Sequence, residues 1–413
     1  MSRPESATGI TQPLAGLSGF FMMAFLLRTL SLEMSLTTQF LVLVFSYAGP
    51  ILIYDFSTKS FPDIIKSLNS NKKTSHKRVW IRLLGLYAIF LLIGLIYFIF
   101  PEYQGEFYSP FYEFLKLAFP FIIIFSIPYF YLMDLYLTDP KDSYWKFGRF
   151  LIGQHEFTKD ILQLLLGWLV KAFFLPLMLI YFSKNINFLM TFDSKIIFRS
   201  FRETFDFLLS FIFMLDVLCA VAGYLCTFRI FDSHIRSTEP TLTGWFCALI
   251  CYQPFWSFFS KNYFAYSSEK SWGYWFQGSA WYPIWGTIIL LFFLIYLWAN
   301  LSFGVRFSNL THRGIITSGP YRFTKHPAYI SKNLAWWMIS MPFMVSGSVA
   351  QSFKCCFMLM LLNGIYFLRA KTEERHLSAD PVYRTYAHYI RENGLFRRLP
   401  KILPNHSFPW ILT

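Results

Sequence analysis

The feature that most constrains the fold of this chain is a succession of long apolar segments separated by short polar connections. A helix that crosses the roughly 30 Å hydrocarbon core of a bilayer needs about 20 apolar residues. About ten segments approach this length, and they predict an all-α, polytopic bundle of transmembrane helices. They span residues 14–31, 36–54, 80–100, 115–137, 160–182, 205–228, 241–259, 280–303, 328–346 and 353–370.

The composition agrees with a membrane protein. Of the 413 residues, 55% are hydrophobic and 15% are charged, which is too little charge to cover a water-soluble protein of this length. The net charge of +14 comes from basic residues in short connections between apolar segments. This distribution favours loops that face anionic lipid over a groove that binds nucleic acid, so no nucleic-acid partner is expected.

The basic connections also predict the orientation of the chain. Connections 55–79 and 138–159 are rich in Lys and Arg, whereas 101–114 contains neither. Because cytoplasmic loops carry the excess of positive charge, both termini are expected in the cytoplasm, together with the connection 304–327. One basic connection, 183–204, falls on the opposite side, which predicts an interfacial helix there or a different number of spans. Arg28 interrupts the first segment, so a re-entrant or interfacial helix is an alternative to a span at 14–31.

The six cysteines indicate no metal site and no redox site. All of them lie inside apolar segments, and none forms a C-x-x-C pair or a cluster with histidine. Free, buried thiols are therefore expected. The amino-terminal residues also lack the basic region and the small-residue cleavage site of a removable signal peptide.

The stretch "GPYRFTKHPAYISKN", residues 319–333, concentrates polar side chains between two apolar segments. Pro327 is expected at the first position of a helix, with His326 just before it. The free backbone N–H groups of such a helix end suit a carboxylate or a phosphate. Tyr329 and Asn333 share one helix face a turn further on. The alternative is a capped helix entrance with interfacial aromatic residues and lysines that reach the lipid headgroups.

A second polar stretch, "NGIYFLRAKTEERHL", leaves the last apolar segment. Helical spacing places Asn363, Tyr366 and Glu373 on one face, with Glu374 beside it, and Arg369 four residues before Glu373 can pair with that acid. Taken alone, this stretch is also compatible with a charged helix end that emerges from the bilayer.

Taken together, the two stretches resemble the integral-membrane methyltransferases related to isoprenylcysteine carboxyl methyltransferase and to phospholipid N-methyltransferases. "GPYRFTKHPAYI" is similar to that family's G-P-Y and [R/K]-H-P-x-Y pattern, and "EERHL" with the later tyrosines is similar to its E-E-x-x-L…Y-x-x-Y pattern. The resemblance covers roughly residues 280–400. Lys325 stands where arginine is common, Ile330-Ser331-Lys332 follow Tyr329 where a small glycine is common, and Asp380-Pro381 stands where glycine is frequent.

The resemblance implies that S-adenosylmethionine binds at the cytoplasmic ends of the last helices. An acid binds its ammonium group, a basic residue or backbone N–H group binds its carboxylate, and tyrosines contact the adenine or the sulfonium. No metal is required. The resemblance implies that methyl transfer involves Arg369, Asn333 and Tyr329, and that the cofactor is bound by Gly319, Tyr321, Arg322, Lys325, His326, Pro327, Tyr329, Glu373, Glu374, Tyr383 and Tyr386.

The function expected from the resemblance is methyl transfer to a lipophilic acceptor in the membrane, either a prenylcysteine-like carboxylate or another lipid. One alternative is a phospholipid amine, which must be neutral to attack and so needs a base that the motifs do not supply. Alternatives of another class are a transporter, although the halves show no symmetry, and a non-catalytic scaffold. The membrane expected is the inner (plasma) membrane of a bacterium or the endoplasmic reticulum of a eukaryote.

Two further expectations concern the rest of the chain. Residues 241–413 are expected to form the methyltransferase-like domain, and residues 1–240 a transmembrane extension to which the sequence assigns no role. Ionisable groups inside a membrane are costly and need partners. Lys171 and Asp216, in the fifth and sixth segments, are therefore predicted to pair across neighbouring helices.

Overall fold

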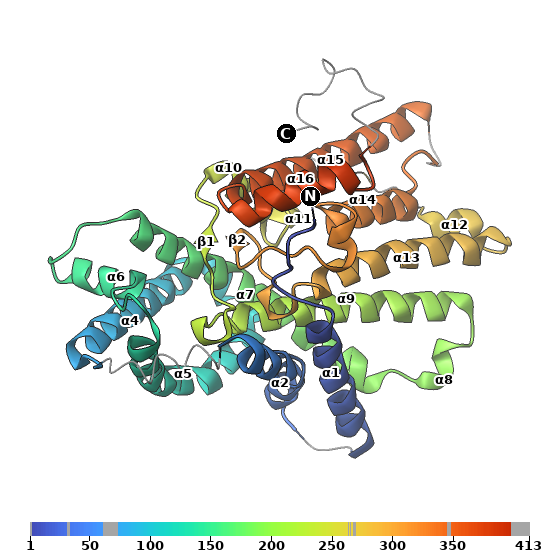
Figure 1. Cartoon of the computed structure of the whole chain (residues 1–413). Helices are drawn as coiled ribbons and strands as arrows, with labels where there is room; N and C mark the ends of the chain where they lie inside the picture. The colour runs from blue at the N-terminus through green and yellow to red at the C-terminus, as the bar shows by residue number, and fades with distance from the viewer. Residues whose placement is uncertain are drawn as a thin grey trace.

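The computed structural model of the chain describes residues 2–30, 34–60, 73–262, 264, 266, 270–344 and 348–397. Within these ranges, eight helices are long and apolar enough to cross a membrane, so the chain is an integral membrane protein with a polytopic helical fold (Figure 1). Residues 61–72 of the first basic connection, and the end of the tail with Lys401, lie outside the described residues. The eight helices are α1 (Thr11–Leu30), α2 (Leu36–Asp55), α4 (His76–Ile99), α5 (Ser109–Tyr136), α7 (Lys159–Thr191), α9 (Phe201–Leu225), α13 (Trp281–Leu301) and α15 (Val349–Leu377).

Shorter elements connect these helices. Two antiparallel β-strands of two residues each join the connection after α9 to the connection after α13, with Ser237 opposite His312. The short helices and strands are α6 (Ser143–Leu151), α8 (Ser194–Ile197), α10 (Leu242–Leu249), α11 (Phe255–Asn262), α12 (Trp272–Phe276), α14 (Pro327–Ser340), α16 (Pro381–Asn393), β1 (Ser237–Thr238) and β2 (Thr311–His312), and single turns of 3₁₀ or π helix lie at Phe56–Ser60, Pro101–Gln104, Glu106–Tyr108, Arg229–Phe231, Gly304–Arg306 and Gly319–Arg322.

Polar side chains at the predicted connections start several of the helices. Ser75 accepts a hydrogen bond from the backbone N–H of Arg78 at the start of α4. Ser200 and Ser348 do the same for α9 and α15. Each hydroxyl satisfies one of the backbone N–H groups that have no partner in the first turn of a helix. The helix starts therefore follow from local sequence as well as from hydrophobicity.

Two of the ten predicted segments are not single long helices. Segment 241–259 is divided into α10 and α11, of eight residues each, with a turn between them. In segment 328–346, α14 has 14 residues and ends at Ser340, where Met341 adopts a left-handed conformation. Hydropathy alone predicted full spans at both places, because it registers apolar content and does not register where the backbone turns.

The path of the chain nevertheless alternates between the two ends of the bundle. Near its start, α9 places Phe201 against Gly286 of α13, and further along it places Asp216 within hydrogen-bonding distance of Asn300. The two helices therefore run side by side in the same direction. The residues between them, which include α10, α11 and α12, return the chain to the end at which α13 begins.

The amino-terminal helix is continuous and is long and apolar enough to cross a membrane, which favours a span over the re-entrant and interfacial alternatives for segment 14–31. It has 20 residues and packs on α2, where Gly19 lies so close to Ser46 that a Cβ atom would stand 2.2 Å from the Ser46 carbonyl oxygen. Close approach through small residues is a common way for membrane helices to pack. The Arg28 guanidinium donates to the carbonyl of Leu189 at 3.2 Å and lies 3.8 Å from the centre of the Phe192 ring.

The basic connection 183–204 is mostly helical. Helix α7 continues to Thr191, α8 follows, and α9 begins at Phe201. Lys184 lies on the extended end of α7, with its ammonium 4.9 Å from the centre of the Phe107 ring. The connection is therefore much shorter than the apolar pattern predicted.

The main core cluster joins both halves of the chain. It includes Phe20 and Phe174 from the first half and Phe293 and Met341 from the second. The side chains of α9 pack against α13 within this cluster. The division at residue 240 stays a prediction, but the core itself does not stop there.

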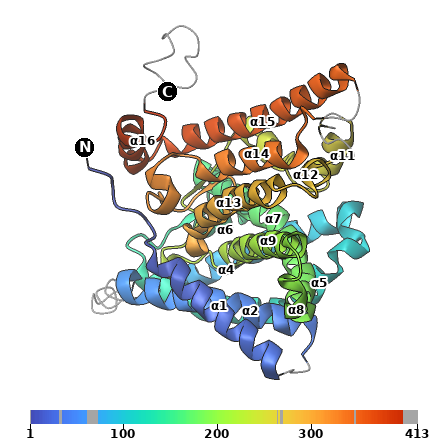
Figure 2. The same ribbon diagram turned by 90° about the vertical axis from the view of Figure 1, so that its right-hand side faces the viewer.

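One end of the bundle, which we call the motif end, carries residues 302–327 and the last turn of α15. Arg306 at this end pairs with Asp55 at the end of α2, at 2.9 Å. The amino-terminal segment and α16 lie at the same end (Figure 2). The described amino-terminal residues, α16 and the connection 304–327 therefore lie at one end of the bundle, whereas the predicted cytoplasmic side of both termini stays a prediction.

Candidate functional site

The G-P-Y turn at the motif end has a shape that requires glycine. Residues Gly319–Arg322 form a single helical turn, and Gly319 has a φ of +59°. A Cβ atom at this position would lie 2.5 Å from the Ser302 hydroxyl oxygen. Both the left-handed conformation and the close contact favour glycine here, since glycine alone carries no Cβ. Pro320 is buried, while Arg322 is exposed and lies outside the cluster described below.

The basic loop and the acidic helix end meet, as predicted. Lys325 Nζ lies 2.7 Å from Glu374 Oε1, and His326 Nε2 lies 3.0 Å from the same oxygen. Pro327 begins α14 with His326 before it, as the sequence indicated. Lys371 Nζ adds a further contact to Glu374 at 3.3 Å. Residues 48 positions apart in the chain thus form one charged cluster.

The second acid has a different set of partners. The Tyr329 hydroxyl donates to Glu373 Oε1, and Arg369 Nε lies 3.4 Å from that oxygen. The Glu373 side chain is 28% exposed, compared with 12% for Glu374, so Glu373 is the more accessible acid. Arg369 is buried and its Nη2 donates to Asn309 Oδ1 at 2.5 Å.

Asn309 is a site residue that sequence reasoning missed. Its side-chain amide nitrogen lies 3.0 Å from the Tyr224 hydroxyl and 3.2 Å from the Tyr252 hydroxyl. These contacts fix the amide so that its oxygen faces Arg369. Asn309 stands in the polar connection that carries the motif, but Tyr224 and Tyr252 lie in apolar segments outside it. No local pattern marks these two tyrosines.

Aromatic rings surround the charged groups. The rings of His326 and Tyr329 stack with centroids 5.6 Å apart and planes 4° apart. The Arg369 guanidinium lies 5.2 Å from the centre of the Tyr329 ring, a distance typical of a cation–π contact. Tyr366 packs edge-on against Tyr329, with centroids 5.5 Å apart.

Asn333 lies one turn deeper on α14, on the predicted face. Its side-chain oxygen accepts a hydrogen bond from Asn363 at 3.1 Å. The Asn363 oxygen accepts in turn from the Trp337 indole at 2.7 Å. The face of α15 predicted from Asn363, Tyr366 and Glu373 therefore meets α14 along its length.

The later tyrosines bring α16 onto the motif loop. The Tyr386 hydroxyl donates to the backbone oxygen of Tyr321 at 2.7 Å, and Tyr383 and Tyr386 pack with Tyr321 and Ile315 in one cluster. The Tyr383 hydroxyl is buried and has no hydrogen-bond partner in the described part of the chain. Burial first, and then the neighbouring Glu374, raise the pKa of Tyr383, so its hydroxyl keeps its proton at neutral pH.

The predicted pair of Lys171 and Asp216 does not form, and that prediction is wrong. Asp216 accepts hydrogen bonds from the Tyr296 hydroxyl at 2.8 Å and from the Asn300 amide at 2.5 Å, both on α13. Lys171 instead lies over the Trp168 ring, at 4.3 Å from its centre. Sequence reasoning assumed that α7 and α9 turn these side chains toward each other, and hydropathy does not determine helix rotation.

The charged residue near Asp216 is Lys332, which the sequence analysis left without a role. Its ammonium lies 5.2 Å from the Tyr296 ring centre, 5.1 Å from that of Trp336 and 6.0 Å from that of Tyr366. Asp216 contacts the same Tyr296 through the hydroxyl of that residue. Among the described residues, no hydrogen bond or ion pair of the Lys332 ammonium is found. Tyr366 separates this cluster, deeper in the bundle, from the charged cluster around Glu373.

The fold and the clusters together define a multi-pass membrane protein with a polar site at one end of its last helices. Residues 284–379 match the model of the isoprenylcysteine carboxyl methyltransferase (ICMT) family. This part of the chain is therefore related to that family, and it contains α14 and the charged end of α15. Comparisons with curated proteins and with solved structures find no match to the chain.

Proposed function

We propose that the protein is an S-adenosylmethionine-dependent methyltransferase that acts on a lipophilic acceptor in the membrane. The observation that carries the proposal is the meeting of Lys325 and His326 with Glu374 beside Tyr329 and Glu373, within the segment related to the ICMT family. A merely capped helix entrance does not need two acids from another helix. The expected side for this site is the cytoplasmic one.

The residues present fit the cofactor. Glu373, the more accessible acid, suits the α-ammonium group, while His326, Lys325 and the first N–H groups of α14 suit the carboxylate. The aromatic cluster of Tyr321, Tyr383 and Tyr386 suits the adenine. The buried Tyr383 hydroxyl supports this fit, because it is a donor with no partner of its own in the described residues.

When bound, the cofactor would supply an activated methyl group, whose carbon an acceptor atom would attack in line while the sulfonium leaves as a neutral thioether. The chain's own residues need no nucleophile for this reaction. Tyr329, held by Glu373 and by stacking on His326, presents its ring beside Arg369 at the inner edge of the site. Arg369 is fixed by Asn309 and Glu373, so it can orient an anionic acceptor without a large rearrangement. The packed aromatic residues exclude water.

The deeper cluster bears on the choice of acceptor. An ammonium with unused N–H donors in an aromatic frame, such as Lys332, favours an anionic acceptor group such as a carboxylate, which is already ionised at neutral pH. Asp216 is the one observation that favours the alternative, a phospholipid amine, because a buried carboxylate near the site can take the proton of an ammonium. Asp216 lies outside the segment related to the family.

The test is calorimetric binding of S-adenosylmethionine to the purified protein, with Glu373→Ala as the comparison. We expect binding by the wild type and a loss of at least about tenfold in the variant, since one charge-assisted contact contributes about 1.5–3 kcal/mol. A transporter has no reason to bind this cofactor here, and a scaffold that has lost the chemistry does not bind it at all. Labelled methyl donor added to membranes then identifies the acceptor.

A further inference from the structure

The amino-terminal segment lies along the residues that lead into the G-P-Y turn. The backbone N–H of Ala7 donates to the Ile315 carbonyl at 2.9 Å. Thr317 makes two hydrogen bonds to this segment. Its N–H donates to the Ser6 hydroxyl at 3.0 Å, and its hydroxyl donates to the Pro4 carbonyl at 2.8 Å. These contacts join residues more than 300 positions apart in the sequence. We call residues 4–12 the strap.

The contacts of the strap continue beside the turn itself. The Ser318 hydroxyl donates to the Thr8 carbonyl at 3.0 Å, and the buried Thr8 hydroxyl donates to the Ser302 carbonyl. Ser302 is also the residue against which Gly319 packs. Gly314, with a φ of +112°, lies so close to the strap that a Cβ atom would stand 2.7 Å from Ala7 Cβ. The loop is therefore shaped to receive the strap.

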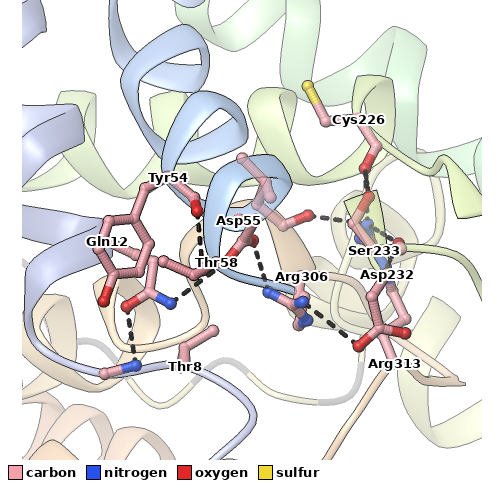
Figure 3. Close-up of polar contacts among 12 residues, drawn as sticks. Thr8, Gln12, Tyr54, Asp55, Thr58, Cys226, Asp232, Ser233, Arg306 and Arg313 are labelled. Carbon is pink, nitrogen blue, oxygen red and sulfur yellow. Dashed lines mark hydrogen bonds and ion pairs between the residues drawn. The ribbon is translucent and has the colours of Figure 1, made fainter. Parts of the chain in front are cut away.

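A buried ion pair anchors the end of the strap (Figure 3). The Gln12 side chain accepts from the Gly9 N–H at 2.8 Å and donates to Asp55 Oδ1 at 3.3 Å. Arg306 Nη1 donates to Asp55 Oδ2 at 2.9 Å, and both charged side chains are almost fully buried. Arg306 belongs to the turn that follows α13. The same network thus holds the strap, the end of α2 and the start of the motif loop.

The other side of the loop is held by α16, through the bond from Tyr386 to the Tyr321 carbonyl. The turn Gly319–Arg322 therefore lies between two supports, both of which come from outside residues 284–379, and the strap comes from the amino-terminal half of the chain. The strap reaches residues 315–318, which directly precede the turn. Without it, the Thr317 N–H and hydroxyl and the Ile315 carbonyl lose their partners.

We infer that the strap is a positioning element of the cofactor site: it orders the loop that carries Gly319 and Tyr321 before the cofactor binds. The inference rests on the proposed function and assigns a role to part of the amino-terminal extension. A loop that is ordered in advance binds more tightly, because the ligand does not have to order it. When the loop is ordered in only a fraction of molecules, the apparent affinity falls by that fraction.

The experiment uses two proline variants of the full-length protein. Ala7→Pro removes the N–H that donates to Ile315, whereas Glu5→Pro is the matched control at an exposed position of the same segment. A third variant, Thr317→Val, loses the hydrogen bond to the Pro4 carbonyl at nearly constant side-chain shape. Calorimetry measures the dissociation constant of S-adenosylmethionine, and hydrogen exchange measures the order of residues 313–321 relative to α9.

We expect Ala7→Pro to weaken cofactor binding about tenfold and to raise exchange in residues 313–321 and not in α9, with a smaller effect of the same sign in Thr317→Val. In a methyl-transfer assay, the KM for the cofactor rises while kcat at saturation is unchanged. If the wild type binds the cofactor and Ala7→Pro binds it equally well, the role of the strap is refuted and the proposed function stands. If the wild type shows no binding, both are refuted.

Discussion

The buried ion pair between Asp55 and Arg306 makes a sharp prediction about stability. The change is Asp55→Asn, which keeps the shape of the side chain and removes its charge. In the wild type the two side chains are 0% and 1% exposed and 2.9 Å apart, so Arg306 is left as a buried cation opposite a neutral amide. Removal of one partner from a buried pair costs about 3–5 kcal/mol.

Neighbouring charges change the loss of stability expected for Asp55→Asn. Asp232 lies 3.6 Å from Arg306 Nη2, but its side chain is 39% exposed and gives only partial compensation. Burial and the neighbouring Arg306 lower the pKa of Arg313 to about 9. Because Asp232 still compensates the charge of Arg306 in part, we expect a loss near the lower end of the range, about 3 kcal/mol, with repulsion between Arg306 and Arg313 included in that loss.

The assay is unfolding of the detergent-solubilised protein by titration with sodium dodecyl sulfate, followed by tryptophan fluorescence. The double variant Asp55→Leu with Arg306→Met is the control, since apolar replacement of both partners of a buried pair is often neutral. We expect it to recover most of the stability that Asp55→Asn loses. A free energy of unfolding within about 0.5 kcal/mol of wild type for Asp55→Asn refutes the reasoning. So does a double variant that is less stable than Asp55→Asn.

The remaining predictions concern the site. His326→Ala and Glu374→Ala each reduce transfer from a labelled methyl donor by at least about tenfold while the protein stays folded, because each removes one side of the contact that joins the loop to α15; unchanged transfer in both contradicts the assignment. If the acceptor is anionic, Lys332→Met lowers methyl transfer about tenfold and leaves cofactor affinity unchanged. If the acceptor is an amine, Asp216→Asn has this effect instead. Comparison of the two variants on one labelled lipid extract decides between the two acceptors. Burial lowers the pKa of His312 to about 4, and the neighbouring Asp380 opposes that shift, so the neutral imidazole stabilises the fold above pH 6.5 and this contribution is lost as the pH falls toward 4. The free energy of unfolding of His312→Asn therefore depends less steeply on pH between these values than that of the wild type. An unchanged slope contradicts this.

The sequence predicted the fold class and the meeting of the two motifs because both depend on local signals. Apolar length marks helices that cross a bilayer, and the turn before Pro327 together with the acids after Arg369 marks the ends of two neighbouring helices. The fold differs from prediction at α10, α11 and α14, where the backbone turns inside apolar sequence. Lys171 and Asp216 failed to pair because helix rotation depends on packing among several helices. Asn309 and its tyrosine partners escaped notice for the same reason.

The short length of α14 has a consequence for the surrounding bilayer. Its 14 residues rise by about 21 Å, whereas the 33 residues of α7 rise by about 50 Å. The hydrophobic thickness of the protein therefore differs from one side of the bundle to another. Lipids beside α14 must shorten or tilt to keep the backbone after Ser340 away from hydrocarbon, while those beside α7 remain extended. A membrane of long, saturated chains would resist that local thinning beside α14, the helix that begins at the charged cluster.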